Sequence, residues 1–137
     1  MTHEKYEFIE FQDGLFGFEE STKFVPMMVE EGSDAVIFLQ SMENEELSFL
    51  IMNPFILNEH YNPVLSDEDY EKLGTNKDEE LSFYVICVAR ETIEDSTVNL
   101  KCPIVVNTIT RQARQVILDS QEYKFRHHLK EFRKEEA

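Results

Sequence analysis

The sequence lacks tryptophan and has only two cysteines, four glycines and four prolines among its 137 residues. Cys87 and Cys102 lie in apolar stretches without a C-x-x-C spacing, which excludes a disulfide framework and indicates a reducing compartment. No apolar run approaches the ~20 residues that a membrane span needs. Residues 1–6 also lack the basic and then apolar profile of a signal peptide. We therefore predict a cytoplasmic protein with no membrane association.

Positive charge is scarce as well. Thirteen lysines and arginines stand against 28 aspartates and glutamates, for a net charge of −15. Residues 1–80 hold 4 basic and 20 acidic side chains, whereas residues 81–137 hold 9 basic and 8 acidic ones. Direct binding to nucleic acid or to an anionic membrane is disfavoured, because phosphate contacts need clustered lysines and arginines. The charge fits a basic protein partner, while an acidic surface that only maintains solubility is the simpler interpretation.

Aromatic residues are abundant, with 11 phenylalanines and 5 tyrosines, and this argues against a disordered chain. The length suits one compact domain, and the sequence contains no linker or internal repeat. We expect residues 1–137 to form a single domain, with the order of the tail at residues 130–137 left open.

Short apolar runs bounded by turn residues predict strands at residues 6–11, 24–29, 36–41, 47–52, 81–90, 98–107 and 114–118. One short helix is predicted over residues 66–74, because Ser66 suits an N-cap, Asp69 suits the N3 position and Gly74 suits a helix end. Residues 123–134 are a second helix candidate. This content predicts a mainly β fold, a small antiparallel β-barrel-like domain or a sandwich, with one short helix.

Groups for catalysis or metal binding are sparse. The histidines are His3, His60, His127 and His128. No G-x-S-x-G elbow occurs, and both cysteines lie in expected strands, so no nucleophile oriented by histidine is indicated. His127 and Glu131 have a spacing that can chelate a metal on a helix, but two ligands make an incomplete site. We predict no catalytic residue, no metal and no cofactor.

The glycine pair within residues 13–19 (DGLFGFE) matches neither of the common phosphate-loop spacings. The acidic residues that follow it would also repel phosphate. We instead predict a tight turn at Gly14 and Gly17. Its apolar side chains, Leu15, Phe16 and Phe18, are expected to tuck under the barrel.

Several motifs follow one another over residues 6–129. They are FQDGLFGFE at 11–19, KFV at 23–25, LQS at 39–41, LSF at 47–49, NPF at 53–55, TVNLKCPIVVN at 97–107, RQVIL at 114–118, Tyr123 and Arg126-His127. In this order and spacing they resemble the flagellar assembly factor FliW family, and the block at 97–107 is the most specific part.

The resemblance implies a small β-barrel-like protein that is monomeric when free and has no enzymatic activity. Proteins of this family bind flagellin and, once released from it, bind CsrA, a dimeric RNA-binding repressor of translation. Binding to CsrA relieves repression of flagellin messenger RNA and so couples flagellin level to flagellum assembly. The motif residues to which the resemblance gives a structural role are Gly14, Gly17, Phe18, Asn99, Pro103 and Asn107.

The sequence departs from the family pattern at four places. Phe16 stands where the family usually has proline, so we expect a differently shaped glycine turn. Cys102 replaces a small alanine, which a core tolerates. Residues 112–114 lack the glycine that is common before the last strand, and residues 130–137 extend past the usual end.

Two elements are candidates for partner binding. The first is an acidic cluster, the densest that we expect to be exposed, and we expect it to contact CsrA. It consists of Asp67, Glu68, Asp69 and Glu71. The alternative role for these acids is to stabilise the helix dipole. Residues 53–55, Asn53-Pro54-Phe55, predict a turn that leaves the Asn53 amide free for hydrogen bonds, with a purely structural turn as the alternative.

A function of another class is the alternative to a regulatory binding protein, namely a small acidic enzyme or a ligand-binding β-barrel with an unrecognised pocket. A pocket with convergent polar groups and perturbed carboxylates would favour that alternative. A filled barrel with an exposed acidic face beside apolar side chains would favour the binding protein.

Overall fold

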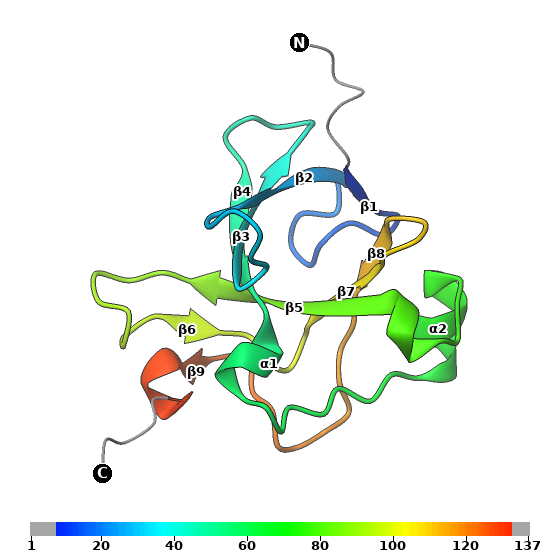
Figure 1. The fold of residues 1–137 in the computed structure, drawn as a ribbon. Helices are drawn as coiled ribbons and strands as arrows, with labels where there is room; N and C mark the ends of the chain where they lie inside the picture. Colours follow the sequence, from blue (N-terminus) through cyan, green and yellow to red (C-terminus); the bar gives the residue numbers. More distant parts are fainter. Residues whose placement is uncertain (1–7, 133–137) are drawn as a thin grey trace.

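The computed structural model describes residues 8–132, in which strands make up most of the regular structure (Figure 1). The strands are β1 (Ile9–Phe11), β2 (Lys23–Met28), β3 (Val36–Ser41), β4 (Ser48–Met52), β5 (Leu81–Val88), β6 (Thr97–Val98), β7 (Ile104–Asn107), β8 (Gln112–Gln115) and β9 (His127–His128). The helices are α1 (Pro54–Leu57), α2 (Asp67–Leu73) and the 3₁₀ turns η2 (Asp78–Glu80) and η3 (Leu129–Phe132). None of these described helices is long and apolar enough to cross a membrane.

The strands β4, β3, β2, β1, β8, β7 and β5 pair in that order, and β5 closes the ring by pairing with β4. The pairings in the ring are antiparallel except for β1 with β8, which is parallel. The length of β5 permits closure, because its first half pairs with β7 and its second half with β4 and β6. The predicted mainly β, barrel-like fold is confirmed, with one parallel pair that the sequence did not indicate.

The barrel wall separates two apolar clusters. Inside the barrel, Phe11 and Phe24 are fully buried and meet edge to face with ring centroids 5.6 Å apart. The outer cluster lies between β5 and the segments that flank α2. Ile104 and Val106 of β7 belong to the inner cluster and Val105 to the outer one, so β7 is buried on both faces. This explains why β7 has an unbroken apolar run rather than an alternating pattern.

The predicted strand over residues 98–107 is wrong in its middle, because β6 ends at Val98 and β7 begins at Ile104. Between them Asn99 Oδ1 accepts a hydrogen bond from the Cys102 N–H at 2.9 Å, which closes a turn. Pro103 has no N–H to donate to a ladder. The predicted strand at 114–118 is likewise shifted, since β8 covers Gln112–Gln115.

The other predicted strands are present with small changes at their ends, and β3 matches the predicted range 36–41. The strand predicted at 6–11 is seen as β1, while residues 6 and 7 lie outside the described residues. The helix predicted over 123–134 is wrong, because His127 pairs with Val98 and forms β9, followed only by the turn η3. Residues 133 and 134 lie outside the described residues.

The connection from β7 to β8 turns without glycine. Asn107 Oδ1 accepts hydrogen bonds from the Ile109 and Thr110 N–H groups, and Arg111 takes the left-handed conformation at φ 67°. The Asn107 amide Nδ2 also donates to the Leu73 carbonyl at 2.9 Å, which ties the end of α2 to the barrel. Asn107 therefore closes the turn before β8 and anchors the end of α2.

Candidate functional site

The helix α2 is fixed at both ends by its own sequence. Ser66 Oγ accepts from the Asp69 N–H and Asp69 Oδ2 accepts from the Ser66 N–H, each at 3.1 Å, which makes a capping box. At the other end Gly74 is left-handed, with φ 76°, and its N–H bonds to the Tyr70 and Glu71 carbonyls. The helix predicted from these residues is confirmed.

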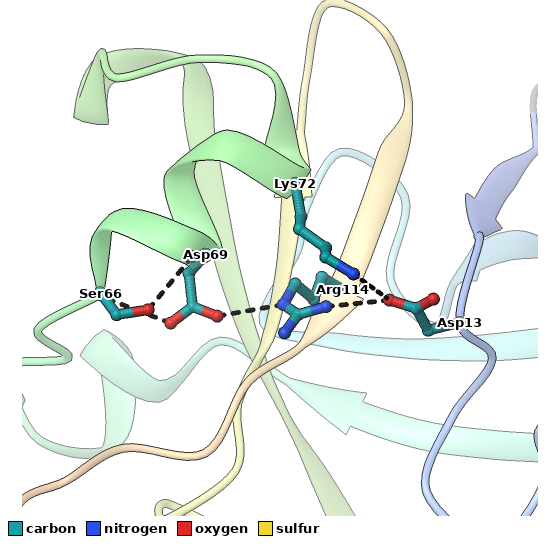
Figure 2. A network of polar contacts seen from close by, with 5 residues as sticks. All are labelled: Asp13, Ser66, Asp69, Lys72 and Arg114. Atoms are coloured by element: carbon teal, nitrogen blue, oxygen red, sulfur yellow. Dashed lines mark hydrogen bonds and ion pairs between the residues drawn. The ribbon is translucent and has the colours of Figure 1, made fainter.

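Arg114 of β8 joins α2 to the barrel (Figure 2). Its Nε donates to Asp69 Oδ1 at 3.0 Å, and its Nη1 donates to Asp13 Oδ2 at 2.9 Å. Lys72 Nζ lies 3.8 Å from the same Asp13 oxygen. The Arg114 and Asp69 side chains are only 22% and 12% exposed, so their ion pair is largely shielded from water and sets the orientation of α2 on β8.

This network corrects the expected exposure of one candidate contact residue. Asp69 is buried, and its carboxylate is shared between the cap and Arg114. Its neighbours Asp67, Glu68 and Glu71 are exposed on α2, as expected. The spacing of the acids alone could not separate them, because the burying partner lies 45 residues away in the sequence.

The turn η2 adds carboxylates beside α2. Tyr70 Oη donates to Asp78 Oδ1 at 2.7 Å, and this bond raises the pKa of Tyr70 above its usual range. The bond holds η2 against the helix, so the two elements present one surface. We call this surface the acidic face, and its exposed carboxylates are those of Asp67, Glu68, Glu71, Asp78 and Glu79.

A groove of about 560 Å³ lies beside the start of α2, between the glycine turn and the segment that follows β8. We call it the α2 groove. Its lining includes three large apolar side chains that are exposed, Phe16, Val64 and Ile117, together with the carboxylates of Glu68 and Asp119. The walls come from three segments far apart in the chain, so no local motif indicated the groove.

The amide of Asn53, predicted to be free, is hydrogen-bonded at both its nitrogen and its oxygen. Its Nδ2 lies 3.3 and 3.2 Å from the two carboxylate oxygens of Asp34, and its Oδ1 accepts from the Phe55 N–H at 2.9 Å. Asn53 is thus the N-cap of α1, with buried Pro54 at the first helical position. Phe55 packs against two aromatic rings of the outer cluster. The geometry of this turn fits the structural alternative.

The glycine turn is present as predicted, with Gly14 at φ 70° and Gly17 at φ 88°. A Cβ on Gly14 would lie 2.5 Å from the Glu19 Cα, whereas one on Gly17 would meet open space. Gly14 is therefore required for close backbone approach as well as for its conformation.

The apolar residues of the turn do not all point inward. Leu15 is buried, but Phe16 and Phe18 are 48% and 45% exposed, which corrects the expectation that all three tuck under the barrel. The Phe16 N–H donates to Gln115 Oε1 at 2.9 Å, and this bond fixes the turn against β8. Phe18 meets Phe49 edge to face at 5.1 Å.

A second cleft, of about 390 Å³, lies at this end of the barrel. We call it the aromatic cleft. It is lined by Phe16, Phe18, Phe49, Ile86, Val88, Thr97, Asn99, Cys102, Gln115, Phe125 and Arg126. No carboxylate occurs among these lining residues, although the chain as a whole carries a charge of −15.

The groups considered for chemistry have structural partners. His127 Nε2 accepts the Lys124 N–H at 2.8 Å, so the ring hydrogen belongs on Nδ1, which lies 3.1 Å from Glu131 Oε1. Partial burial raises the pKa of Glu131, but the hydrogen bonds from His127 and the His128 N–H outweigh this and lower it. Burial raises the pKa of the Cys87 and Cys102 thiols, which disfavours the reactive thiolate. Across residues 8–132 no three histidine, cysteine or carboxylate side chains gather as metal ligands would.

Comparison with known proteins gives one consistent family. Residues 1–129 match the family model of the FliW protein. The chain is 35% identical over 123 residues to the flagellar assembly factor FliW of Ruminiclostridium cellulolyticum, covering 90% of this chain and 83% of that one. It is also 35% identical over 127 residues to the protein of that name from Alkaliphilus metalliredigens, covering 91% and 77%. A crystal structure of the flagellar assembly factor FliW superposes with a TM-score of 0.85 at 34% identity, covering 94% of this chain and 89% of that one.

Proposed function

The chain belongs to the FliW family, and from that premise we propose that it is a non-enzymatic regulator that binds CsrA and flagellin as alternative partners. While it is bound to flagellin in the cytoplasm, CsrA stays free to repress flagellin translation. When flagellin is consumed by assembly, the released protein binds CsrA and relieves the repression. The flagellin level then controls flagellin synthesis through a single pool of this protein.

The acidic face is the observation that carries the CsrA part of the proposal. Its five carboxylates lie on α2 and η2. The Arg114 network holds α2 on the barrel, and the bond from Tyr70 to Asp78 holds η2 against α2. CsrA must present basic surface to hold RNA, since phosphate contacts depend on lysine and arginine. A preorganised acidic surface attracts such a protein at long range and loses little conformational entropy on contact.

The same charge provides a mechanism for antagonism. RNA phosphates and the acidic face both bear negative charge, so a protein docked next to the RNA site would weaken RNA binding by repulsion without filling that site. Because CsrA is a dimer, the contact would be repeated on each half, with two copies per dimer. The effect must run through CsrA, because the acidic surface repels RNA directly.

The packing of the barrel supports this proposal over the ligand-binding alternative. Buried aromatic and aliphatic side chains occupy the interior, apart from a hollow of about 250 Å³ whose lining includes Ile9, Val106, Asp34 and Tyr84. Two polar groups of this lining bond to each other, since Tyr84 Oη donates to Asp34 Oδ2 at 3.4 Å. The acidic face, in contrast, lies beside exposed apolar side chains.

Binding kinetics with purified CsrA at several salt concentrations test the proposal. Replacing Glu68 and Glu71 with lysine should slow association about tenfold at low salt and flatten its salt dependence. The matched control is Glu20→Lys with Glu122→Lys, which applies the same charge change at exposed positions outside the acidic face. If association is the same for the wild-type protein and the α2 variant at every ionic strength, the acidic face is not the contact. Failure of the wild-type protein to bind CsrA at any salt would contradict the proposed function.

A further inference from the structure

The backbone beside the α2 groove has an edge that is bonded on one side only. The Val116 N–H donates to the Pro103 carbonyl at 3.0 Å, and the Leu118 N–H donates to the Lys101 carbonyl at 2.9 Å. In extended backbone successive N–H groups point to opposite sides, so the Ile117 N–H points away from residues 101–103. Within residues 8–132 no hydrogen bond reaches the Ile117 N–H, and Ile117 lines the groove. The edge therefore offers a donor to an incoming extended chain.

Three apolar side chains surround this edge. Ile117 is 62% exposed, Val64 is 70% exposed and Phe16 is 48% exposed, and all three line the α2 groove. They come from the segment after β8, the segment before α2 and the glycine turn. Exposed apolar side chains that gather in one groove with polar rims mark an interaction site more often than scattered ones do. An aliphatic side chain of a partner would be covered on three sides here.

The charge that remains at the groove is negative. Arg114 is the cation in the lining, and it is already paired with Asp13 and Asp69 at 2.9 and 3.0 Å. Glu68 and Asp119 lie on the same lining, and neither forms an ion pair with a described residue. A partner segment is therefore favoured when lysine or arginine flanks its apolar side chain, and the net charge of −15 adds to that preference.

We propose that the α2 groove binds an extended basic segment of the protein partner, which adds a strand along residues 116–119. Strand addition gives affinity through main-chain hydrogen bonds, and pockets for alternate side chains give selectivity. In this arrangement the Ile117 N–H donates to the added chain and an aliphatic side chain of the partner lies among Phe16, Val64 and Ile117. Basic side chains on either side approach Glu68 and Asp119. The inference rests on the proposed function in taking the partner to be a basic protein.

Titration of the full-length chain with purified CsrA tests the groove. Ile117→Lys and Val64→Lys place a cation and a long side chain in the groove at exposed positions, and each should weaken binding at least tenfold. The matched control is Ile109→Lys, since Ile109 is 71% exposed and lies outside the groove, in the turn before β8. Its affinity should stay within about twofold of wild type, as expected for a surface change away from an interface. Circular dichroism confirms the fold of each variant.

Hydrogen exchange supplies a readout that side-chain contact alone would not change. Strand addition should slow exchange of the Ile117 amide at least tenfold in the complex, while the Ile109 amide stays unchanged. If CsrA binds the wild-type and both groove variants equally, or leaves the Ile117 amide unprotected, the groove proposal is overturned and the proposed function stands. If CsrA does not bind the wild-type protein at all, both are overturned.

Discussion

The α2 groove and the aromatic cleft share Phe16 and Gln115 in their linings, yet they differ in charge and in backbone. The groove is lined by carboxylates and by a backbone edge whose Ile117 N–H has no hydrogen-bond partner within residues 8–132. The aromatic cleft has Arg126 and no carboxylate in its lining. One glycine turn thus supplies a wall to two surfaces of opposite character. The charge of −15 is therefore distributed unevenly over the surface. Because the carboxylates lie at the groove, a basic partner is attracted to the groove rather than to the more apolar cleft.

The largest loss of stability is expected from substitutions in the glycine turn, which lines both the α2 groove and the aromatic cleft. Gly14→Ala should destabilise the protein by more than about 3 kcal/mol, because the left-handed conformation is strained and the new Cβ would meet the Glu19 backbone. Gly17→Ala has the same conformational strain without a clash and should cost only about 1–2 kcal/mol. Urea denaturation of both variants measures the difference. Equal losses would show that the close approach at Gly14 does not matter.

Replacing Arg114 should disturb the position of α2 beside the α2 groove and leave the aromatic cleft unchanged, because Arg114 lines only the groove. Arg114→Met leaves the shielded Asp69 carboxylate without its cation and should cost about 2–4 kcal/mol. Asp13→Asn removes the exposed arm of the same network and should cost less than about 1 kcal/mol. Denaturant midpoints give both values, and CsrA affinity should fall with Arg114→Met. A cost below that of Asp13→Asn would contradict the view that the buried pair orients α2.

Phe125→Ser tests whether the aromatic cleft takes part in binding the basic partner. Phe125 is 62% exposed, so stability should change by no more than about 0.5 kcal/mol. The affinity for CsrA and its salt dependence should match those of the wild-type protein. A loss as large as that of Ile117→Lys would assign the partner to the cleft instead of the groove.

The smallest effect concerns the segment that carries Arg126. The pKa of Glu131 is lowered from 4.5 in the folded state, so the contact with His127 adds stability above that pH and loses it as the pH falls. Glu131→Gln should therefore be less stable than the wild-type protein at pH 7, and the gap in stability should close as the pH falls below 4.5 and through the lowered folded-state pKa. Thermal unfolding of both proteins across pH 3–7 measures this difference in stability. A gap that is constant with pH would show that the ionised carboxylate contributes nothing.

Local signals predicted local structure well. The range of α2 followed from Ser66, Asp69 and Gly74, whose side chains or backbone act within one turn of the helix. The strand β3 followed from a short apolar run between turn residues. In both cases the interactions that decide the structure join residues close together in the sequence, so the sequence carries the signal directly.

Features that depend on distant partners were missed. Asp69 was expected on the surface because Arg114, which buries it, lies in another strand. The Asn53 amide was expected to be free because its partner Asp34 lies 19 residues earlier, next to it only once β3 pairs with β4. The α2 groove is assembled from three separate segments, and the exposed rings of Phe16 and Phe18 depend on how the glycine turn docks on β8. None of these could be deduced from spacing alone.

A titration of CsrA with a labelled flagellin messenger RNA fragment and this protein together tests the central claim most directly. We predict that the protein lowers RNA affinity by a finite factor without binding RNA itself, and that RNA lowers the affinity of the protein by the same factor, because coupling is reciprocal. Saturating RNA should leave a ternary complex. Strictly competitive curves, in which saturating RNA reduces bound protein to zero, would contradict the separate-site mechanism, and unchanged RNA affinity would contradict antagonism altogether.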